Sequence, residues 1–185
     1  MRVISGTAKG TKLDTLDALD TRPTLDRVKE SLFNILQSKL YDSVVLDLFA
    51  GSGALGIEAL SRGAKKAVFC DYSKYAYNII KKNLVKTKLE EKSIVFNKDY
   101  NICLDILEDK FDIVFLDPPY DTEMAANAMF KIIERNLLAD NAIIVVETDD
   151  EERIISKVVN TEIRVYDIRK YGRAKLVFLE RKEQK

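Results

Sequence analysis

The stretch Val44-Val45-Leu46-Asp47-Leu48-Phe49-Ala50-Gly51-Ser52-Gly53 decides the fold of this chain. Its first half is a short apolar run of the kind that forms a buried strand, and its second half is a glycine turn. Residues 51–56 complete the pattern G-x-G-x-x-G, which cofactor sites use where a first strand ends. Glycine lets the backbone pass close to a ligand because no Cβ interferes. We therefore expect a nucleoside cofactor to bind at this turn.

Apolar runs of strand length alternate with helical patterns along the rest of the chain. The strands are predicted at residues 44–49, 66–71, 93–96, 111–117, 141–147, 162–167 and 174–180, and the helices at 54–62, 73–86, 100–108, 123–137 and 149–159. This alternation indicates a parallel sheet covered by helices on both faces. The connection over residues 168–173 is shorter than the roughly twelve residues of a parallel crossover, so the last two strands should form an antiparallel hairpin. The expected fold class is α/β, a Rossmann-like sheet of about seven strands that is mostly parallel.

Residues 1–40 precede this alternation and form an extension to it. A helix is predicted to begin after Pro23-Thr24, where the Thr24 side chain can cap the first amides. Val28, Leu32 and Leu36 then recur at helical spacing. With 185 residues, the chain is expected to be a single domain, 1–185, in which the extension 1–40 joins a Rossmann-like core at 41–185.

The composition excludes several classes of protein. Hydrophobic residues make up 46% and charged residues 32%, as in ordinary globular proteins. No stretch approaches the roughly 18 consecutive apolar residues of a membrane span, and the N-terminus lacks the apolar core of a secretory signal, so we expect a cytoplasmic protein without a membrane partner. The chain has no histidine, and Cys70 and Cys103 fall in a strand-like run and a helical stretch. Histidine-based catalysis and a metal site are therefore not expected.

Basic residues are unevenly distributed, although Lys plus Arg and Asp plus Glu both total 30 and the formal net charge is zero. A neutral chain argues mildly against a nucleic-acid-binding protein, which usually shows a basic field. The segment 164–185 is nevertheless rich in Arg and Lys, and an acidic run at 147–152 precedes it. A local basic surface is one interpretation of this segment, and solvated charge is the other.

Three carboxylates in or just after the first three strands are candidates for cofactor binding, and one of them, Asp47, favours S-adenosylmethionine over NAD. Asp71 ends the second strand, where its two oxygens can accept from both hydroxyls of a ribose, as NAD or S-adenosylmethionine would require. Asp47 lies before the glycine turn, where a negative charge suits cationic sulfonium and ammonium groups better than a pyrophosphate; its alternative role is to cap the following loop. Asp99 is placed to accept from an adenine amino group, with Asn97 as a rival and a helix N-cap as the alternative. The predicted cofactor-binding residues are Asp47, Phe49, Ala50, Gly51, Ser52, Gly53, Asp71 and Asp99.

The tetrapeptide Asp117-Pro118-Pro119-Tyr120 follows the apolar run at 113–116 and suits transfer of a methyl group to an aromatic amine. Such an amine is a poor nucleophile because its lone pair is delocalised into the ring. The Asp117 carboxylate and the Pro118 carbonyl could accept from its N–H groups and disperse the developing positive charge, while the prolines restrict the backbone. Tyr120 would stack on a base that has left its helix. The alternative is a strand-terminating turn in which Tyr120 only packs; otherwise Asp117, Pro118, Pro119 and Tyr120 are the predicted catalytic residues.

Beyond these motifs, the chain resembles the RsmD-like family of bacterial small-subunit rRNA guanine-N2 methyltransferases, which have the class I S-adenosylmethionine-dependent fold. The resemblance covers nearly the whole chain. The matching stretches are Arg2-Val3-Ile4-Ser5-Gly6 with Gly10 and Leu13, Arg22-Pro23-Thr24 with Asp26-Arg27-Val28 and Glu30, Leu32-Phe33-Asn34, Asp47, residues 49–62, residues 117–120, Glu147, and Lys170-Tyr171-Gly172. One departure is Asp71, which stands where many relatives carry glutamate and should still reach a ribose.

The resemblance implies methyl transfer from S-adenosylmethionine to N2 of one guanine in small-subunit (16S) rRNA, within an assembling 30S particle. We expect the protein to be a monomer. From the residues themselves, the predicted substrate-binding residues are Arg22, Thr24, Arg27 and Tyr120. The first three are chosen because arginines and helix N-termini favour phosphate, and Tyr120 because it can stack on the base. Arg27 could instead pair with Glu30 or Glu58. Two other functions stay open: a DNA adenine-N6 methyltransferase, which uses the same tetrapeptide, and a non-catalytic RNA-binding or ribosome assembly factor on this fold.

Overall fold

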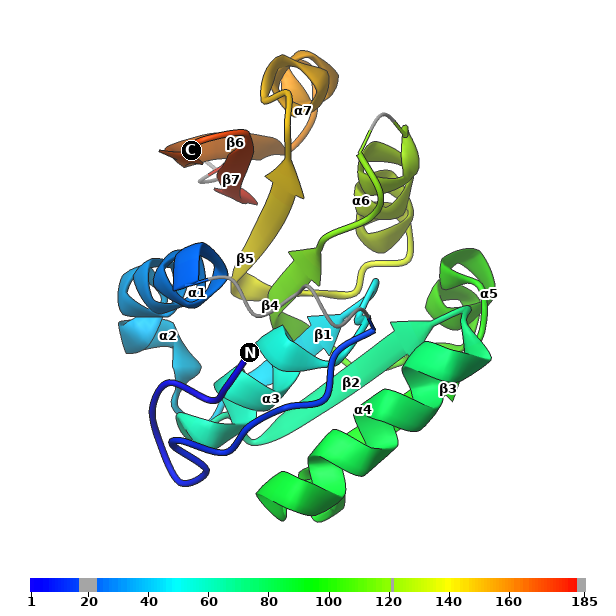
Figure 1. Cartoon of the computed structure of the whole chain (residues 1–185). Coiled ribbons are helices and arrows are strands. Elements are labelled where there is room, and N and C mark those ends of the chain that lie inside the picture. The colour runs from blue at the N-terminus through cyan, green and yellow to red at the C-terminus, as the bar shows by residue number, and fades with distance from the viewer. Residues whose placement is uncertain (17–22, 121, 183–185) are drawn as a thin grey trace.

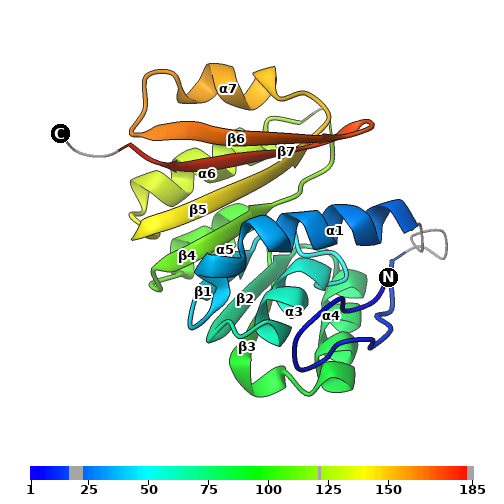
Figure 2. The ribbon, with the colours of Figure 1, turned by 90° about the vertical axis from the view of Figure 1, so that its left-hand side faces the viewer.

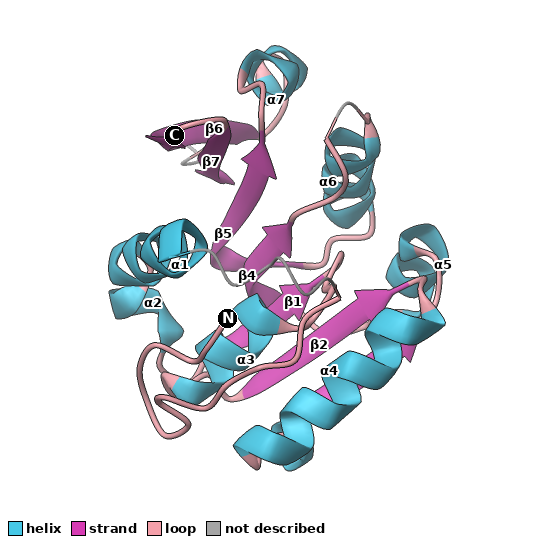
Figure 3. Ribbon diagram, viewed as in Figure 1, coloured by secondary structure: helices cyan, strands magenta, loops and turns pink. Residues whose placement is uncertain are grey.

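The structure, a computed structural model, describes residues 1–16, 23–120 and 122–182. Its elements follow in the order α1 (Pro23–Ile35), α2 (Gln37–Leu40), β1 (Val44–Asp47), α3 (Ala54–Ser61), β2 (Lys66–Asp71), α4 (Lys74–Thr87), η1 (Glu90–Lys92), β3 (Ser93–Asn97), α5 (Tyr100–Ile106), β4 (Phe111–Leu116), α6 (Met124–Glu134), β5 (Leu138–Thr148), α7 (Glu152–Val158), β6 (Ile163–Tyr171) and β7 (Ala174–Arg181). Helices surround a single twisted sheet (Figure 1 and, by element type, Figure 3). Within the described ranges, no helix has both the length and the apolarity needed to cross a bilayer.

The sheet has seven strands in the order β3-β2-β1-β4-β5-β7-β6. β1 pairs in parallel with β2 on one side and with β4 on the other, and the parallel register continues to β3 and to β5. β7 lies antiparallel between β5 and β6. The predicted Rossmann-like, mostly parallel sheet with a C-terminal hairpin is therefore confirmed. Because the chain order reverses at β1, the crevice beyond the carboxyl ends of β1 and β4 is the place where such sheets bind ligands.

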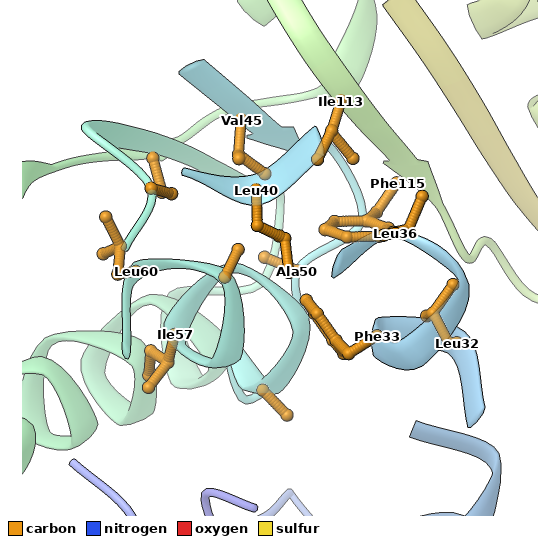
Figure 4. Close-up of a cluster of buried hydrophobic side chains, with 14 of the residues drawn as sticks. Leu32, Phe33, Leu36, Leu40, Val45, Ala50, Ile57, Leu60, Ile113 and Phe115 are labelled. Atoms are coloured by element: carbon orange, nitrogen blue, oxygen red, sulfur yellow. The ribbon is translucent and has the colours of Figure 1, made fainter. Parts of the chain in front are cut away.

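Two apolar clusters, one on each face of the sheet, hold the helices. Alternation along the strands divides their side chains, so that Val45 and Ile113 belong to one cluster and Leu46 and Val114 to the other. In the first cluster, α1 and α3 pack on the sheet, and the rings of Phe33 and Phe115 lie 5.8 Å apart (Figure 4). Helices α5, α6 and α7 cover the opposite face. Both faces are buried, as the continuous apolar strands predicted.

The N-terminal segment 1–16 lies across α3 and beside α4 (Figure 2). The strand-like Val3-Ile4 forms no full strand; an isolated bridge joins Arg2 to Lys12 instead. Gly6 has φ +83°, and a Cβ there would lie 1.7 Å from the Ser61 carbonyl oxygen. Only glycine therefore allows the segment to approach α3 this closely.

Some predicted boundaries were wrong. α1 begins at Pro23, so Thr24 lies inside the first turn and is not the residue before the helix. Proline suits the first helical position because its missing N–H has no partner there anyway. β5 begins at Leu138, three residues before the predicted 141, because Phe111 pairs with Leu138 ahead of a register shift.

Candidate active site

A cavity of about 1120 Å³ lies at the carboxyl edge of β1, β2, β4 and β5. The glycine turn after β1 and the tetrapeptide after β4 both line it. Of the predicted site residues, the structure places Asp47, Phe49, Ala50, Gly51, Ser52, Asp71, Asp99, Asp117, Pro118, Pro119 and Tyr120 in this one lining. Gly53 is buried behind it against Ile80. The adjacency of β1 and β4 brings together two motifs that are far apart in the sequence.

Asp47 is a buried carboxylate beneath the glycine turn. Its side chain is 2% exposed, and Oδ2 accepts the Gly56 N–H at 3.0 Å. This hydrogen bond to the start of α3 agrees with the alternative role of Asp47, which is to cap the loop that follows β1. Burial raises the pKa of Asp47 to about 7, against the lowering effect of the Gly56 N–H, and the charge of Asp71 adds to the rise. Among the described residues no cationic side chain pairs with Asp47, so a cationic ligand would compensate its charge.

Asp71 fixes the shape of the turn from the end of β2. Its Oδ2 accepts the Gly51 N–H at 2.9 Å and its Oδ1 accepts the Ser73 N–H at 2.9 Å. A carboxylate oxygen can accept more than one hydrogen bond, so both oxygens keep capacity for a diol. Gly51 has φ +55°, a conformation that a side chain would disfavour.

Asp99 and Asn97 follow β3 but differ in their surroundings. Asp99 is exposed, caps α5 by accepting the Asn101 N–H at 2.9 Å, and lines the cavity. Asn97 does not line it, and its side-chain amide donates to the carbonyls of Asp71 and Tyr72. The rings of Phe49 and Tyr100 lie 5.3 Å apart at this side of the cavity. A planar adenine would thus meet Asp99 and two aromatic rings.

The tetrapeptide leaves the sheet directly after β4. Asp117 and Pro119 are exposed, whereas Pro118 is buried. The Tyr120 hydroxyl donates to Glu147 Oε1 at 3.0 Å. Burial, together with the negative charge of Glu147, raises the pKa of Tyr120, so this hydroxyl remains a donor. Tyr120 is therefore held in position by a carboxylate from the neighbouring strand.

Two residues at this side of the site were not predicted as site residues: Glu147 lines the cavity, and Arg173 contacts Tyr120 without lining it. Leu116 and Val146 are register partners, so Glu147, the penultimate residue of β5, lies at the same level as Asp117. The Arg173 guanidinium lies 5.4 Å from the centre of the Tyr120 ring and donates to Asp149 at 2.9 Å. An acidic residue at the end of a buried strand was the available signal for Glu147. The position of Arg173 depends on the hairpin β6–β7 and had no such signal.

The predicted substrate-binding residues of the extension are not brought into the cavity. Arg22 lies outside the described residues, as does the side chain of Thr24. Arg27 is exposed on α1 and does not line the cavity, although Val28 and Lys29 do. The alternative pairing was also wrong, because Glu58 pairs with Lys29 and Arg62, and no ion pair joins Arg27 to a described residue.

The arrangement suits S-adenosylmethionine chemically. Asp47 would meet cationic groups, Asp71 a ribose, and Asp99 with the rings of Phe49 and Tyr100 an adenine. Beyond this half, the cavity continues to Asp117, Tyr120 and Glu147, which leaves room for an acceptor next to the cofactor. A buried carboxylate with no cationic partner among the described residues is the observation that decides this fit.

Comparisons with known proteins agree with this geometry. The family model described as Conserved hypothetical protein 95 matches residues 1–180. Ribosomal RNA small subunit methyltransferase D of Haemophilus influenzae is 44% identical over 162 residues, which cover 84% of this chain and 82% of that protein. The protein of the same name from Escherichia coli strain K12 is 38% identical over 151 residues, 82% of this chain and 76% of that protein.

A solved structure from Escherichia coli, described as the putative methyltransferase yhhF, superimposes with a TM-score of 0.86 at 33% identity, covering 100% of this chain and 99% of that chain. The fold is thus that of the class I methyltransferases, and the cofactor is S-adenosylmethionine. The chain belongs to the family described as Conserved hypothetical protein 95, the RsmD-like methyltransferases.

Proposed function

We propose that this protein transfers a methyl group from S-adenosylmethionine to the exocyclic N2 amine of a guanine in small-subunit ribosomal RNA. The names of the relatives support ribosomal RNA as the substrate. The observation that carries the choice of guanine is the pair of carboxylates, Asp117 and Glu147, that share the acceptor half of the cavity. The same pair argues against adenine.

The Watson–Crick edge of guanine presents two adjacent donors, the N1–H and the 2-amino group. Carboxylates accept hydrogen bonds and, when ionised, donate none. Asp117 and Glu147 lie on adjacent strand ends, so one can accept from the amine and the other from N1–H. Adenine places an acceptor, N1, next to its amine, and this atom would face a carboxylate without a hydrogen between them. Two acceptors that face each other once the base fills the cavity are a strong means of rejection.

The protein's part in the reaction is to orient and to stabilise. S-adenosylmethionine, when bound, supplies an activated methyl group on a cationic sulfonium. Asp117 and the Pro118 carbonyl accept from the target amine, which turns its lone pair toward the methyl group and disperses the positive charge that develops. Tyr120 stacks on the flipped base, and its bond to Glu147 fixes the plane of the ring.

The cofactor half follows the geometry of the glycine turn. We propose that Asp47 meets the cationic groups, that Asp71 accepts from the ribose, and that Asp99 accepts from the adenine amine. The backbone of residues 49–53 forms the wall along which the cofactor lies. We also place the reaction in the cytoplasm, on an assembling 30S particle, with the enzyme acting as a monomer.

Other acceptors should be compared directly with rRNA. The release factor glutamine methyltransferase of Borreliella burgdorferi is 33% identical over 92 residues, but these cover only 50% of this chain and 30% of that protein. This relative makes a protein amide an acceptor to test beside rRNA. DNA adenine is the other, because its methyltransferases use the same tetrapeptide. A non-catalytic assembly factor is disfavoured by the two complete motifs that share one cavity.

The test is to incubate the protein with labelled S-adenosylmethionine and, separately, small subunits, naked rRNA, duplex DNA and total protein. Digestion of the product to nucleosides then identifies the modified base. We expect N2-methylguanine from small subunits. Label confined to DNA or to protein would overturn the proposal, and so would a methylated base other than guanine.

A matched variant tests the part assigned to Glu147. Placing 2-aminopurine at the mapped nucleotide keeps the 2-amino group but makes N1 an acceptor. The wild type should methylate this substrate at least about tenfold more slowly than guanine. Glu147→Gln, whose amide can donate to N1, should lower the ratio of the methylation rate on guanine to that on 2-aminopurine. An unchanged ratio in the variant would show that Glu147 does not face N1.

A further inference from the structure

The basic segment near the C-terminus is neutralised by its own fold. The hairpin β6–β7 carries cations whose carboxylate partners lie on the hairpin itself, at Glu162 just before it, or in the acidic run before α7. The pairs are Arg164–Glu180 at 2.7 Å, Arg169–Asp167 at 2.9 Å, Lys170–Glu151 at 2.6 Å, Arg173–Asp149 at 2.9 Å, Lys175–Glu151, and Arg181–Glu162 at 3.5 Å. A polyanion gains little from cations that are already paired, because the negative charge of each neighbouring carboxylate cancels most of the cation's attraction. The local basic surface suggested by this segment is thus largely cancelled.

Helix α4 shows the opposite arrangement. The sequence from Tyr72 to Leu89 contains no acidic residue. Lys74, Lys81 and Lys88 are exposed and form no ion pair with a described residue. Lys82 and Lys86 share one carboxylate, Asp14 of the N-terminal segment. The exposed side of α4 therefore keeps a net positive charge.

The position of α4 connects this charge to the active site. The helix begins just after Asp71, at the carboxyl edge of the sheet, and runs back beside β2 and β3 (Figure 1). Its 14 residues correspond to a length of about 21 Å. Tyr72 and Tyr75 are 78% and 60% exposed, and both line the cavity. Large exposed rings thus stand at the mouth, and lysines follow along the helix. Lys98, also exposed and in the lining, adds a cation on the β3 side.

We propose that the α4 face, defined as Tyr72, Lys74, Tyr75, Lys81 and Lys88, binds the RNA strand that flanks the target nucleotide. The proposal rests on the proposed function, since it assigns a surface to that substrate. Lysines that contact phosphates release counterions, and tyrosines stack on unpaired bases. An anionic membrane fits this face less well. A helix that lies on a bilayer needs a broad apolar side, whereas Val85 is the exposed aliphatic residue of α4.

Two triple variants of equal charge test the proposal. Lys74→Gln/Lys81→Gln/Lys88→Gln alters the α4 face, and Arg164→Gln/Arg169→Gln/Lys170→Gln alters the paired hairpin. Each removes three positive charges from a chain whose formal net charge is zero. Glutamine retains good helix propensity, so α4 should persist. The measurement is the dissociation constant for small-subunit RNA between about 50 and 200 mM salt, by filter binding.

We expect the α4 variant to bind about tenfold more weakly and to lower the slope of log K against log salt by about 2 to 3. The hairpin variant should stay within about twofold of the wild type. Equal losses in both variants would attribute binding to overall charge, and an unchanged α4 variant would exclude the surface. Binding to vesicles of anionic lipid that the α4 variant loses, with RNA binding intact, would assign the face to a membrane.

A double variant tests whether Tyr72 and Tyr75 stack on RNA bases. Tyr72→Ala/Tyr75→Ala should weaken RNA binding by about tenfold while affinity for S-adenosylmethionine stays unchanged. A loss of cofactor affinity with RNA binding intact would move both rings to the cofactor site. Methylation of small subunits by the wild type is scored in parallel. If it occurs while the α4 variant binds normally, the surface fails and the proposed function stands; if it does not occur, the function fails whatever the variants bind.

Discussion

Asp47 and Glu58 lie close together in the sequence and are both buried, with 2% and 0% exposure, yet their surroundings differ completely. Glu58 pairs with Lys29 at 3.3 Å and with Arg62 at 2.8 Å, and it accepts the N–H groups of Ile4 and Ser5. Asp47 accepts one N–H, that of Gly56, and faces the cavity. Glu58 is compensated within the protein, whereas Asp47 is not.

The different surroundings of Asp47 and Glu58 indicate that one carboxylate serves ligand binding and the other serves the stability of the fold. Asp47 and residues 49–62 all belong to the stretches that resemble the family, but the two ends of this region act differently. The C-terminal end, with Glu58 and Ser61, binds the N-terminal segment: Ser61 Oγ donates to the Ser5 carbonyl at 2.6 Å and accepts the Ala8 N–H at 2.9 Å. The N-terminal end forms the wall of the cavity. An ionisable residue that lacks compensation in a cavity is the better candidate for ligand binding.

The largest effect should come from removing the compensated carboxylate. Glu58→Ala would leave Lys29 buried without its partner and two backbone N–H groups without an acceptor. Breaking a buried pair costs about 3–5 kcal/mol, or roughly 10 °C in Tm for a chain of this size. Thermal and urea unfolding would measure the loss.

Glu30→Ala is the matched control, because Glu30 is exposed on α1. It should change the free energy of unfolding by less than about 0.5 kcal/mol. If Glu58→Ala is as stable as this control, then the Glu58 network does not hold the N-terminal segment. The structural role assigned to Glu58, in contrast to Asp47, would then be wrong.

The next effect concerns chemistry rather than folding. Asp117→Ala should lower the rate of methyl transfer by about 10²–10³, because one electrostatic group that acts in the transition state is lost. Cofactor affinity should stay within a few fold of the wild type. Single-turnover rates and calorimetry would separate the two quantities.

Asp117→Asn keeps an oxygen that can accept from the amine, so it should recover part of the rate. A loss of cofactor binding in folded Asp117→Ala would instead assign Asp117 to the cofactor half. The amine-orienting mechanism would then be wrong.

Asp71 should show a smaller effect, limited to binding. Asp71→Ala removes an acceptor of two backbone N–H groups and the proposed ribose contact. The cofactor dissociation constant should rise by the equivalent of roughly 1.5–3 kcal/mol, with a modest change in maximal rate. Unchanged affinity in a folded variant would remove Asp71 from the site.

Much of this arrangement could be predicted from the chain. Strand ends followed by Asp71, Asp99 or Asp117 predict side chains at one edge of a parallel sheet, because that edge collects all carboxyl ends. The hairpin followed from the short connection between its strands. These are local patterns, and local patterns are what a sequence displays.

Pairings between distant residues could not be predicted. The bond between Tyr120 and Glu147 requires that β4 and β5 be neighbours in register. Neutralisation of the basic hairpin depends on Glu151 and Asp149, whose reach to Lys170 and Arg173 is set by the tertiary fold. Arg27, chosen for its charge, lies away from the cavity because Val28 and Lys29 occupy the side of α1 that faces it.

The smallest effect on cofactor affinity should be a pH dependence that Asp47 shows and its Asn variant lacks. Burial raises the pKa of Asp47 to about 7 in the folded protein, above its ordinary 3.8. The folded state therefore retains a proton that the unfolded state releases, so this residue's contribution to stability should fall as the pH rises from about 4 to about 7.

Binding of a cation at Asp47 should have the opposite sign. The cation prefers the ionised carboxylate, so below about pH 7 it must first expel a proton, and affinity for S-adenosylmethionine should rise about eightfold from about pH 6 to about pH 7.5. Asp47→Asn should bind more weakly and lose this rise, while any dependence due to other groups remains in both proteins. Calorimetry in buffers of different ionisation enthalpy would count the released proton. If affinity for S-adenosylmethionine changes with pH equally in the wild type and in Asp47→Asn, Asp47 does not meet the cofactor's charge. Its burial would then be explained by the Gly56 contact alone.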